Sequence, residues 1–181
     1  KLLTGEVRLP GFKEKWEKKK VGDLITESKE VAKNPSLDKR ITVRLNLMGV
    51  QKREVSAIEK EGATTQYVRR AGQFIYGKQN LHKGALGLVP KELDGYQSSS
   101  DIPSFDFKKG ICGLWFYYYF SRESFYTNLE RIATGTGSKR IHPNDLFMVK
   151  IFVPPFEEQK KISEVLKCMD EEILFYQKEL E

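Results

Sequence analysis

The last stretch of the chain, residues 153–181, constrains the architecture more than any other part of the sequence. Pro154 and Pro155 end whatever element precedes them, and Glu157 and Glu158 then complement the positive end of a helix dipole. Apolar residues follow at alternating spacings of four and three, which is a heptad seam. The seam consists of Ile162, Leu166, Met169, Ile173, Tyr176 and Leu180. The sequence therefore predicts a long amphipathic helix over 155–181.

A lone helix that exposed this seam would be marginally stable in water, because most helical stability in proteins comes from packing an apolar face. The seam therefore predicts a partner helix and a coiled coil. The alternative is that the helix packs back on its own domain. The sequence leaves both arrangements open.

Charge divides the chain at the same place. The whole chain carries 31 Lys and Arg against 25 Asp and Glu, a formal net charge of +6. Residues 156–181 hold four Lys and eight acidic residues, so their net charge is −4 and residues 1–155 carry +10. A strongly basic domain attracts polyanions, chiefly nucleic acid, since phosphate contacts release counterions. A basic surface that serves only solubility is the alternative.

Length and composition fit one globular domain with a core of its own. The chain has 181 residues, of which 39% are hydrophobic and 31% charged. No apolar run approaches the ~20 residues that span a bilayer, and the first residues lack the apolar core of a secretory signal. Cys112 and Cys168 are too few for a disulfide framework. We therefore expect a cytoplasmic protein with reduced thiols and no membrane contact.

The order of patterns predicts an α+β fold, in which a compact mixed domain with an irregular β core precedes the long helix. Residues 1–15 are expected to form an exposed lead-in segment, 16–154 the domain and 155–181 the helix. Short runs of alternating residues broken by glycines are typical of small strands and tight turns.

Four segments carry the more specific predictions. Alternating apolar residues predict strands over 41–50 and 72–78, and an apolar run predicts a buried strand over 146–153. The aromatic segment 111–133 predicts one or two helices, joined near Ser121. This segment would be the main apolar support of the domain.

Several short motifs are similar to catalytic ones, and each lacks a residue that the chemistry needs. Residues 135–139 resemble a phosphate-binding loop, but Ile132 stands where its first glycine is required and the order is Gly-Ser-Lys. The Val-Pro-Pro-Phe sequence at 153–156 is similar to a motif of amino-methyltransferases, yet valine cannot accept a hydrogen bond from a target amine. His82 and His142 lack neighbouring metal ligands or a nucleophile. We therefore predict no catalytic residue, no metal site and no cofactor.

Polar loops of the basic domain carry the candidate DNA contacts. Arg or Lys pairs with guanine, Gln or Asn with adenine, Ser with either, and all of them with phosphate. The candidates for reading bases are Arg69, Arg70, Lys78, Gln79, Asn80, Gln97, Ser98, Ser99 and Ser100. The candidates for holding phosphate are Lys83, Thr136, Ser138, Lys139 and Arg140. For any one of these stretches, an ordinary polar turn is the alternative.

Four stretches, in this order, resemble the specificity subunits of type I restriction-modification systems. They are RLPGFKEKWEKKKVGDL (8–24), YVRRAGQFIYGKQNLHKGALGLVPKELDGYQSS (67–99), ERIATGTGSKRIHPNDL (130–146) and IFVPPFEEQKKISEVLKCMDEEI (151–173). The last contains the proline, then Glu-Glu-Gln-x-x-Ile, that opens the conserved helix of that family. Together they span most of the chain, and the ordered set is more specific than any one stretch.

The resemblance implies a DNA target recognition domain over 16–154 and a conserved spacer helix over 155–181. Such a domain reads one half of a bipartite site on double-stranded DNA, and the helices of two units pack together and set the distance between the halves. Methyltransferase (modification) subunits and motor-nuclease (restriction) subunits assemble on this scaffold, and the specificity subunit is not itself an enzyme.

The chain is similar to one half of such a subunit, with one recognition domain and one helix. A homodimer through the helix, or a second half-subunit, would therefore supply the missing partner helix. Two alternatives stay open: the recognition domain of a combined restriction-methylation enzyme, and an assembly module that does not contact DNA.

Overall fold

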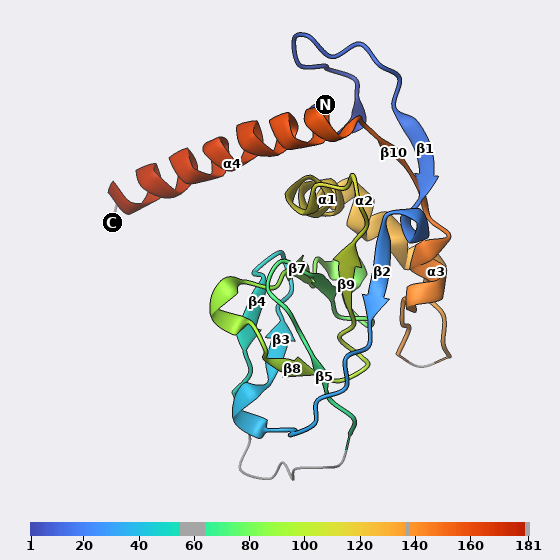
Figure 1. Ribbon diagram of the computed structural model, residues 1–181, viewed down its shortest axis with the longest axis vertical. Coiled ribbons are helices and arrows are strands. Elements are labelled where there is room, and N and C mark those ends of the chain that lie inside the picture. Colours follow the sequence, from blue (N-terminus) through green and yellow to red (C-terminus); the bar gives the residue numbers. More distant parts are fainter. Residues whose placement is uncertain (55–63, 137, 180–181) are drawn as a thin grey trace.

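The computed structural model describes residues 1–54, 64–136 and 138–179, and it confirms the predicted α+β fold with a long C-terminal helix (Figure 1). Leu180, the last residue of the predicted seam, lies outside the described residues. The strands are β1 Glu17–Lys20, β2 Ile25–Ser28, β3 Ile41–Val43, β4 Val50–Lys52, β5 Tyr67–Val68, β6 Phe74–Tyr76, β7 Leu86–Leu88, β8 Gln97–Ser98, β9 Ser104–Phe107 and β10 Lys150–Val153.

The helices are of two kinds. The α-helices are α1 Gly113–Phe120, α2 Glu123–Tyr126, α3 Pro143–Phe147 and α4 Phe156–Glu179. Short 3-10 helices connect the other elements: η1 Leu2–Thr4, η2 Val21–Asp23, η3 Leu37–Lys39, η4 Leu81–Lys83, η5 Lys91–Leu93 and η6 Thr127–Ile132.

The described strands pair antiparallel in four small sheets. The largest has the order β2-β9-β6-β7, and the others are the pairs β1-β10, β3-β4 and β5-β8. All three residues of β6, one of the predicted strands, are buried. Phe74 and Tyr76 belong to the main core, whereas Ile75, on the opposite face of the strand, belongs to a second, smaller core. The central sheet therefore lies between two apolar layers.

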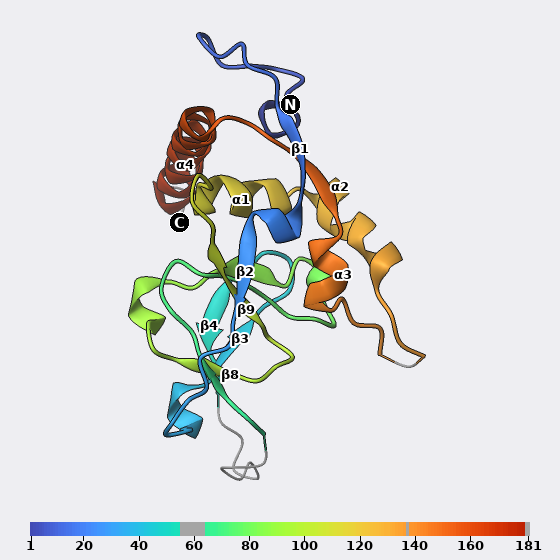
Figure 2. The same ribbon diagram turned by 45° about the vertical axis from the view of Figure 1, so that its right-hand side comes forward.

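The aromatic segment forms a helical layer over the central sheet. α1 ends at Phe120 and α2 begins after Arg122, so the chain bends next to Ser121 as predicted. Trp115, Phe116 and Phe120 are completely buried, and the Phe116 ring meets Phe74 edge-on at a centroid distance of 5.0 Å. Figures 1 and 2 show α1 between α4 and the sheet. The segment is the apolar support that the sequence predicts.

The predicted strand over 41–50 is instead a hairpin of β3 and β4. Its turn contains Asn46 and Leu47, whose φ angles of 54° and 60° are rare for residues other than glycine. Their N–H groups donate to the carbonyl oxygens of Lys83 and Gly84, at 3.0 Å in each case. These hydrogen bonds come from a loop far along the chain, so the local alternation of residues could not indicate the turn.

The apolar run 146–153 is a shorter strand than predicted. Its first two residues complete α3, and β10 begins only at Lys150. Pro143 stands at the start of α3, where its fixed φ angle favours a helix. In β10, Ile151 and Val153 are buried while Lys150 and Phe152 are exposed.

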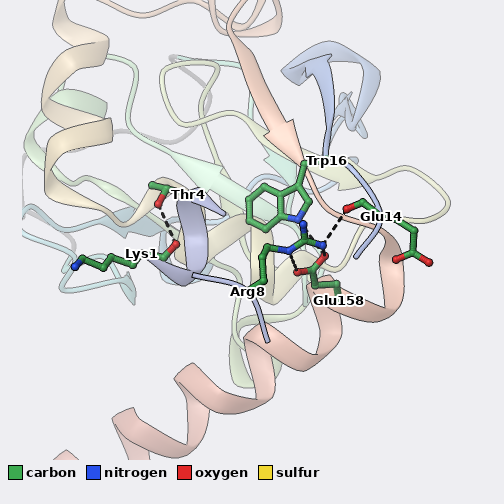
Figure 3. Close-up of polar contacts among 6 residues, drawn as sticks. All are labelled: Lys1, Thr4, Arg8, Glu14, Trp16 and Glu158. Atoms are coloured by element: carbon green, nitrogen blue, oxygen red, sulfur yellow. Dashed lines mark hydrogen bonds and ion pairs between the residues drawn. The ribbon is translucent and has the colours of Figure 1, made fainter. Parts of the chain in front are cut away.

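The lead-in segment is more closely packed than predicted, and a buried carboxylate ties it to the first turn of α4. The side chain of Glu158 is 0% exposed. Arg8 donates to its two oxygens from Nε at 2.6 Å and Nη2 at 2.8 Å, and the indole N–H of Trp16 donates at 3.0 Å (Figure 3). Leu2, Leu3 and Leu9 of the same segment pack against the main core.

The next residue of α4 fixes the other side of that turn. The side-chain oxygen of Gln159 accepts from the backbone N–H of Cys112 at 2.8 Å, and its amide group donates to the carbonyl oxygens of Gly110 and Pro154. Ile162, one turn later, is buried in the main core. The Glu-Glu-Gln-x-x-Ile stretch is therefore the end of the helix that docks on the domain.

Candidate nucleic-acid interface

Three polar loops meet at one residue of the basic domain. The backbone N–H of Lys78 donates to the carbonyl oxygen of Asp101 at 2.9 Å, and the carbonyl oxygen of Lys78 accepts from the N–H of Ile141 at 2.8 Å. Tyr76, buried next to it, donates its hydroxyl to the carbonyl oxygen of Ile141 at 3.0 Å. The loop after β6, the loop between β8 and β9, and the chain after η6 are thus held together. We call this the loop junction, comprising residues 77–80, 99–102, 134–136 and 138–141.

The loop junction gathers most of the candidates from the sequence. Residues 134–136 and 138–140 are the two arms of a hairpin, because Thr134 and Arg140 exchange backbone hydrogen bonds of 2.8 and 2.9 Å. Figures 1 and 2 show this hairpin projecting beside α3, away from α4. Candidate side chains that are exposed or half-buried here are Lys78, Gln79, Asn80, Ser99, Ser100, Thr136, Ser138, Lys139 and Arg140.

The basic side chains of the hairpin are in loose contact with acids. Arg140 Nε lies 3.5 Å from Asp101 Oδ1, and Lys139 Nζ lies 4.0 Å from Glu130 Oε1. All four side chains are 40% or more exposed. Exposed ion pairs of this kind contribute little stability, so these cations are available to an incoming polyanion.

Three of the candidates are internal. Arg69 is 1% exposed, and Gln97 and Ser98 are also buried. Arg69 Nε donates to Ser98 Oγ at 2.6 Å, and Nη1 donates to Ser104 Oγ at 3.0 Å. The amide of Gln97 donates to the carbonyl oxygen of Asn34 and accepts from a backbone N–H. Direct contact with a base edge does not fit this placement, and the three residues instead hold the loops in position.

Two further candidates lie outside the loop junction. Arg70, the neighbour of Arg69, is exposed and donates through Nε and Nη2 to the two carboxylate oxygens of Glu30. This pairing holds the pKa of Glu30 below its ordinary value. Lys83 is exposed at the end of η4, and its carbonyl oxygen supports the β3–β4 turn. Arg70 would have to leave its carboxylate to contact a base.

Two pockets adjoin the loop junction and share Lys78 as a wall. The larger, of about 370 Å³, is lined by Glu27, Ser28, Lys29, Tyr67, Arg69, Lys78, Ser100, Pro103, His142, Pro143 and Asn144. The smaller, of about 150 Å³, includes Gln79, Asn80, Asp101 and Arg140. We call the larger one the Arg69 pocket.

Sequence reasoning did not identify several residues of these pockets. Lys29, His142, Asn144 and Asp101 line these pockets, and none of them is among the DNA-contact candidates of the sequence. Each is a single polar residue that folding brings next to others from distant parts of the chain. No local pattern could have identified them.

The outer part of α4 is a second candidate surface. Tyr118 of α1 donates its hydroxyl to Asp170 at 2.7 Å, and every described helix residue after Asp170 is exposed. Burial and this carboxylate raise the pKa of Tyr118. Five apolar side chains near the C-terminal end of α4 are 53–59% exposed: Met169, Ile173, Leu174, Phe175 and Tyr176. The first part of α4 thus packs on its own domain, which is one of the two arrangements that the sequence left open, and the rest is uncovered. Pairing of that uncovered part with a second helix stays a prediction.

The described residues contain no group of three or more His, Cys, Asp or Glu that could hold a metal ion. Among the helices of residues 1–54, 64–136 and 138–179, none is long and apolar enough to cross a membrane.

Solved structures share this arrangement of domain and helix. The HsdS subunit from Thermoanaerobacter tengcongensis matches with a TM-score of 0.67 and 21% identity, over 96% of this chain and 46% of that one. A chain from work on complex assembly and conformational transition of the type I R-M system matches with a TM-score of 0.59 and 15% identity, over 98% of this chain and 45% of that one. The type I restriction-modification S subunit from M. genitalium matches with a TM-score of 0.59 and 14% identity, over 90% of this chain and 40% of that one. At these identities the likeness shows the fold, and this chain spans less than half of each of those chains.

The sequence itself identifies the family. No curated protein matches the chain. The family model described as "Type I restriction modification DNA specificity domain" matches residues 13–181, which is nearly the whole chain and includes the loop junction and α4. The chain therefore belongs to the family of type I restriction-modification DNA specificity domains.

Proposed function

We propose that this chain recognises a short sequence in double-stranded DNA, as one recognition unit of a type I restriction-modification complex. The loop junction is the observation that carries the proposal. It places amide, hydroxyl and basic side chains together on a part of the chain with a net charge of +10, and these are the groups that contact base edges and phosphates. The unit contributes recognition and leaves catalysis to other subunits.

The burial pattern suggests a division of roles among the candidates. Gln79 and Asn80 are the amide side chains of the junction, and adenine is the base that amides read best. Ser99 and Ser100 accept or donate to either type of base pair. Lys139 is an exposed cation and Arg140 a half-buried cation of the hairpin, and Lys83 is an exposed cation outside the loop junction. We assign all three to phosphates.

The uncovered end of α4 would pair with a second helix of the same kind. This helix would come from a second copy of the chain or from a second recognition unit, and the pairing would present two recognition domains at a fixed separation. Each unit would then read one half of a bipartite site. Methyltransferase and motor-nuclease subunits would assemble on the paired helices.

Lys139→Ala tests phosphate anchoring. Lys139 is exposed on the hairpin, and its replacement should weaken binding to all duplex sequences. It should also reduce the magnitude of the negative slope of log K against log salt by about one. Gel-shift titrations with a random duplex at several salt concentrations measure both quantities. An unchanged slope would remove Lys139 from the phosphate contacts.

The same titrations decide between the proposal and its alternatives. An assembly module would not bind duplex at low salt, even with a type I methyltransferase subunit present. The recognition domain of a combined restriction-methylation enzyme would bind DNA without such a subunit, and its longer reading frame would carry a methyltransferase motif.

A further inference from the structure

The Arg69 pocket contains a buried positive charge that no carboxylate contacts among the described residues. The four acceptors of the Arg69 guanidinium are the hydroxyls of Ser98 and Ser104 and the carbonyl oxygens of Ser28 and Ser99. All four are neutral. Burial lowers the pKa of Arg69 to about 10, so the group is still protonated at neutral pH.

A buried charge without a counter-charge is destabilising, because the charge loses the hydration that it had in water. Two features keep Arg69 in this position. Its Nε and Nη1 atoms are fixed by the hydroxyls of β8 and β9, and its guanidinium lies 5.4 Å from the centroid of the Tyr67 ring. The geometry is therefore rigid, while the charge is compensated in part by the Glu27 carboxylate, which lines the same pocket without a hydrogen bond to Arg69. An anion in the adjoining pocket would supply a negative charge in direct contact.

The rest of the pocket wall is suited to such an anion. Lys78 adds a second cation that is free of an ion pair with the lining residues, and Ser100 adds an exposed hydroxyl. Glu27 is the one acidic residue of the lining, and its carboxylate is already paired with Lys29 Nζ at 3.1 Å. A volume of about 370 Å³ is at the low end of the range for ligand pockets, which leaves room for a phosphate group with an adjoining sugar.

We propose that the Arg69 pocket binds one phosphate group, that of a phosphodiester in the DNA backbone, with Arg69 as its buried charge and Lys78 and Ser100 as its contacts. A guanidinium, an ammonium and a hydroxyl form charge-assisted hydrogen bonds with phosphate oxygens. This assignment gives Lys78 and Ser100 a positioning role in place of base reading, and it leaves Ser99 as the hydroxyl that reads a base. The anion-site proposal rests on the proposed function only in naming DNA as the source of the phosphate. Inorganic phosphate has the same chemistry and is the alternative source.

Lys78→Ala and Ser100→Ala test the site in the full chain. The backbone of Lys78 makes the hydrogen bonds of the loop junction, so alanine retains them. Lys91→Ala is the matched control, because it removes one exposed lysine, in η5, that lines neither pocket. The first measurement is the melting temperature in inorganic phosphate against chloride at equal ionic strength. The second is the salt dependence of binding to duplexes of several sequences.

We expect phosphate to raise the melting temperature of the wild type and of Lys91→Ala in a saturable way, and to have less effect on Lys78→Ala and Ser100→Ala. Lys78→Ala should also reduce the magnitude of the slope of log K against log salt by about one and weaken binding equally for all sequences. The proposal is overturned if Lys78→Ala matches Lys91→Ala in both measurements. It is also overturned if Lys78→Ala changes the sequence preference at one base pair and leaves the salt slope of binding unchanged. That result would make Lys78 a base contact and would leave the proposed function intact. If phosphate stabilises the wild type through Lys78 and no duplex binds, the anion site stands and the proposed function fails.

Discussion

Replacing Glu158 with glutamine should lower the free energy of unfolding by about 3 kcal/mol, because it breaks a buried ion pair between the lead-in segment and α4. Glutamine keeps the size of the side chain and removes the charge. Its amide N–H groups would also face the N–H donors of Arg8 and Trp16, so that at least one hydrogen bond is lost.

The magnitude follows from the burial of the two partners. Breaking a buried pair by removing one charge costs ~3–5 kcal/mol. The Glu158 side chain is fully buried, but that of Arg8 is 27% exposed, and water can partly solvate the guanidinium that is left behind. The lower end of the range is therefore expected. For a chain of 181 residues this corresponds to a fall in melting temperature of roughly 6–12 °C.

Glu157→Gln is the matched control. It removes the same charge from the same helical turn, but the Glu157 side chain is 70% exposed and pairs with Lys160 at the surface. Its loss should cost less than about 1 kcal/mol. Urea unfolding followed by circular dichroism and by tryptophan fluorescence measures both variants. If Glu158→Gln and Glu157→Gln unfold at the same urea concentration, the buried pair does not fix the helix and the reasoning is refuted.

The remaining predictions concern packing and pairing. Gly113→Ala should destabilise the chain by about 1–3 kcal/mol, because a Cβ atom there would lie 2.6 Å from Cε2 of Phe107. Gly77→Ala, whose nearest contact would be an ordinary 3.7 Å, should cost less in the same urea titration. Ile173→Glu should shift the solution mass from twice 20.9 kDa to 20.9 kDa without changing the melting of the domain, whereas Cys168→Glu, at an exposed position off the seam, should not. A wild-type chain that is monomeric at micromolar concentration would contradict pairing between copies.

The long helix could be predicted because its signals are local. The heptad spacing, the prolines and the acidic first turn all lie within residues 153–181, and α4 occupies Phe156–Glu179. The heptad spacing does not reveal where the contact between α4 and the domain ends. Ile162 and Tyr176 follow the same repeat, yet Ile162 is buried in the core and Tyr176 is exposed. The hairpin turn at Asn46 depends in the same way on a hydrogen bond from a distant loop.

The candidate site could be predicted in its residue types and not in its geometry. Arg69 and Arg70 are adjacent and chemically identical, yet one is buried among serines and the other is paired with Glu30 at the surface. The sequence does not distinguish them, because their difference depends on strands β8 and β9 and on residue 30. The Arg69 pocket likewise combines residues from five separate segments of the chain.

Sequence preference on duplex DNA tests the central claim most directly. Random duplexes would be selected on the full chain, and the selected sequence and a scrambled version would then be titrated at the same salt concentrations. The account predicts one enriched motif, with each mutated base pair costing about 1–3 kcal/mol of binding free energy. It also predicts that Asn80→Ala relaxes the preference at one position while Lys139→Ala weakens all sequences alike. Equal binding of selected and scrambled duplexes at every salt concentration would contradict the account.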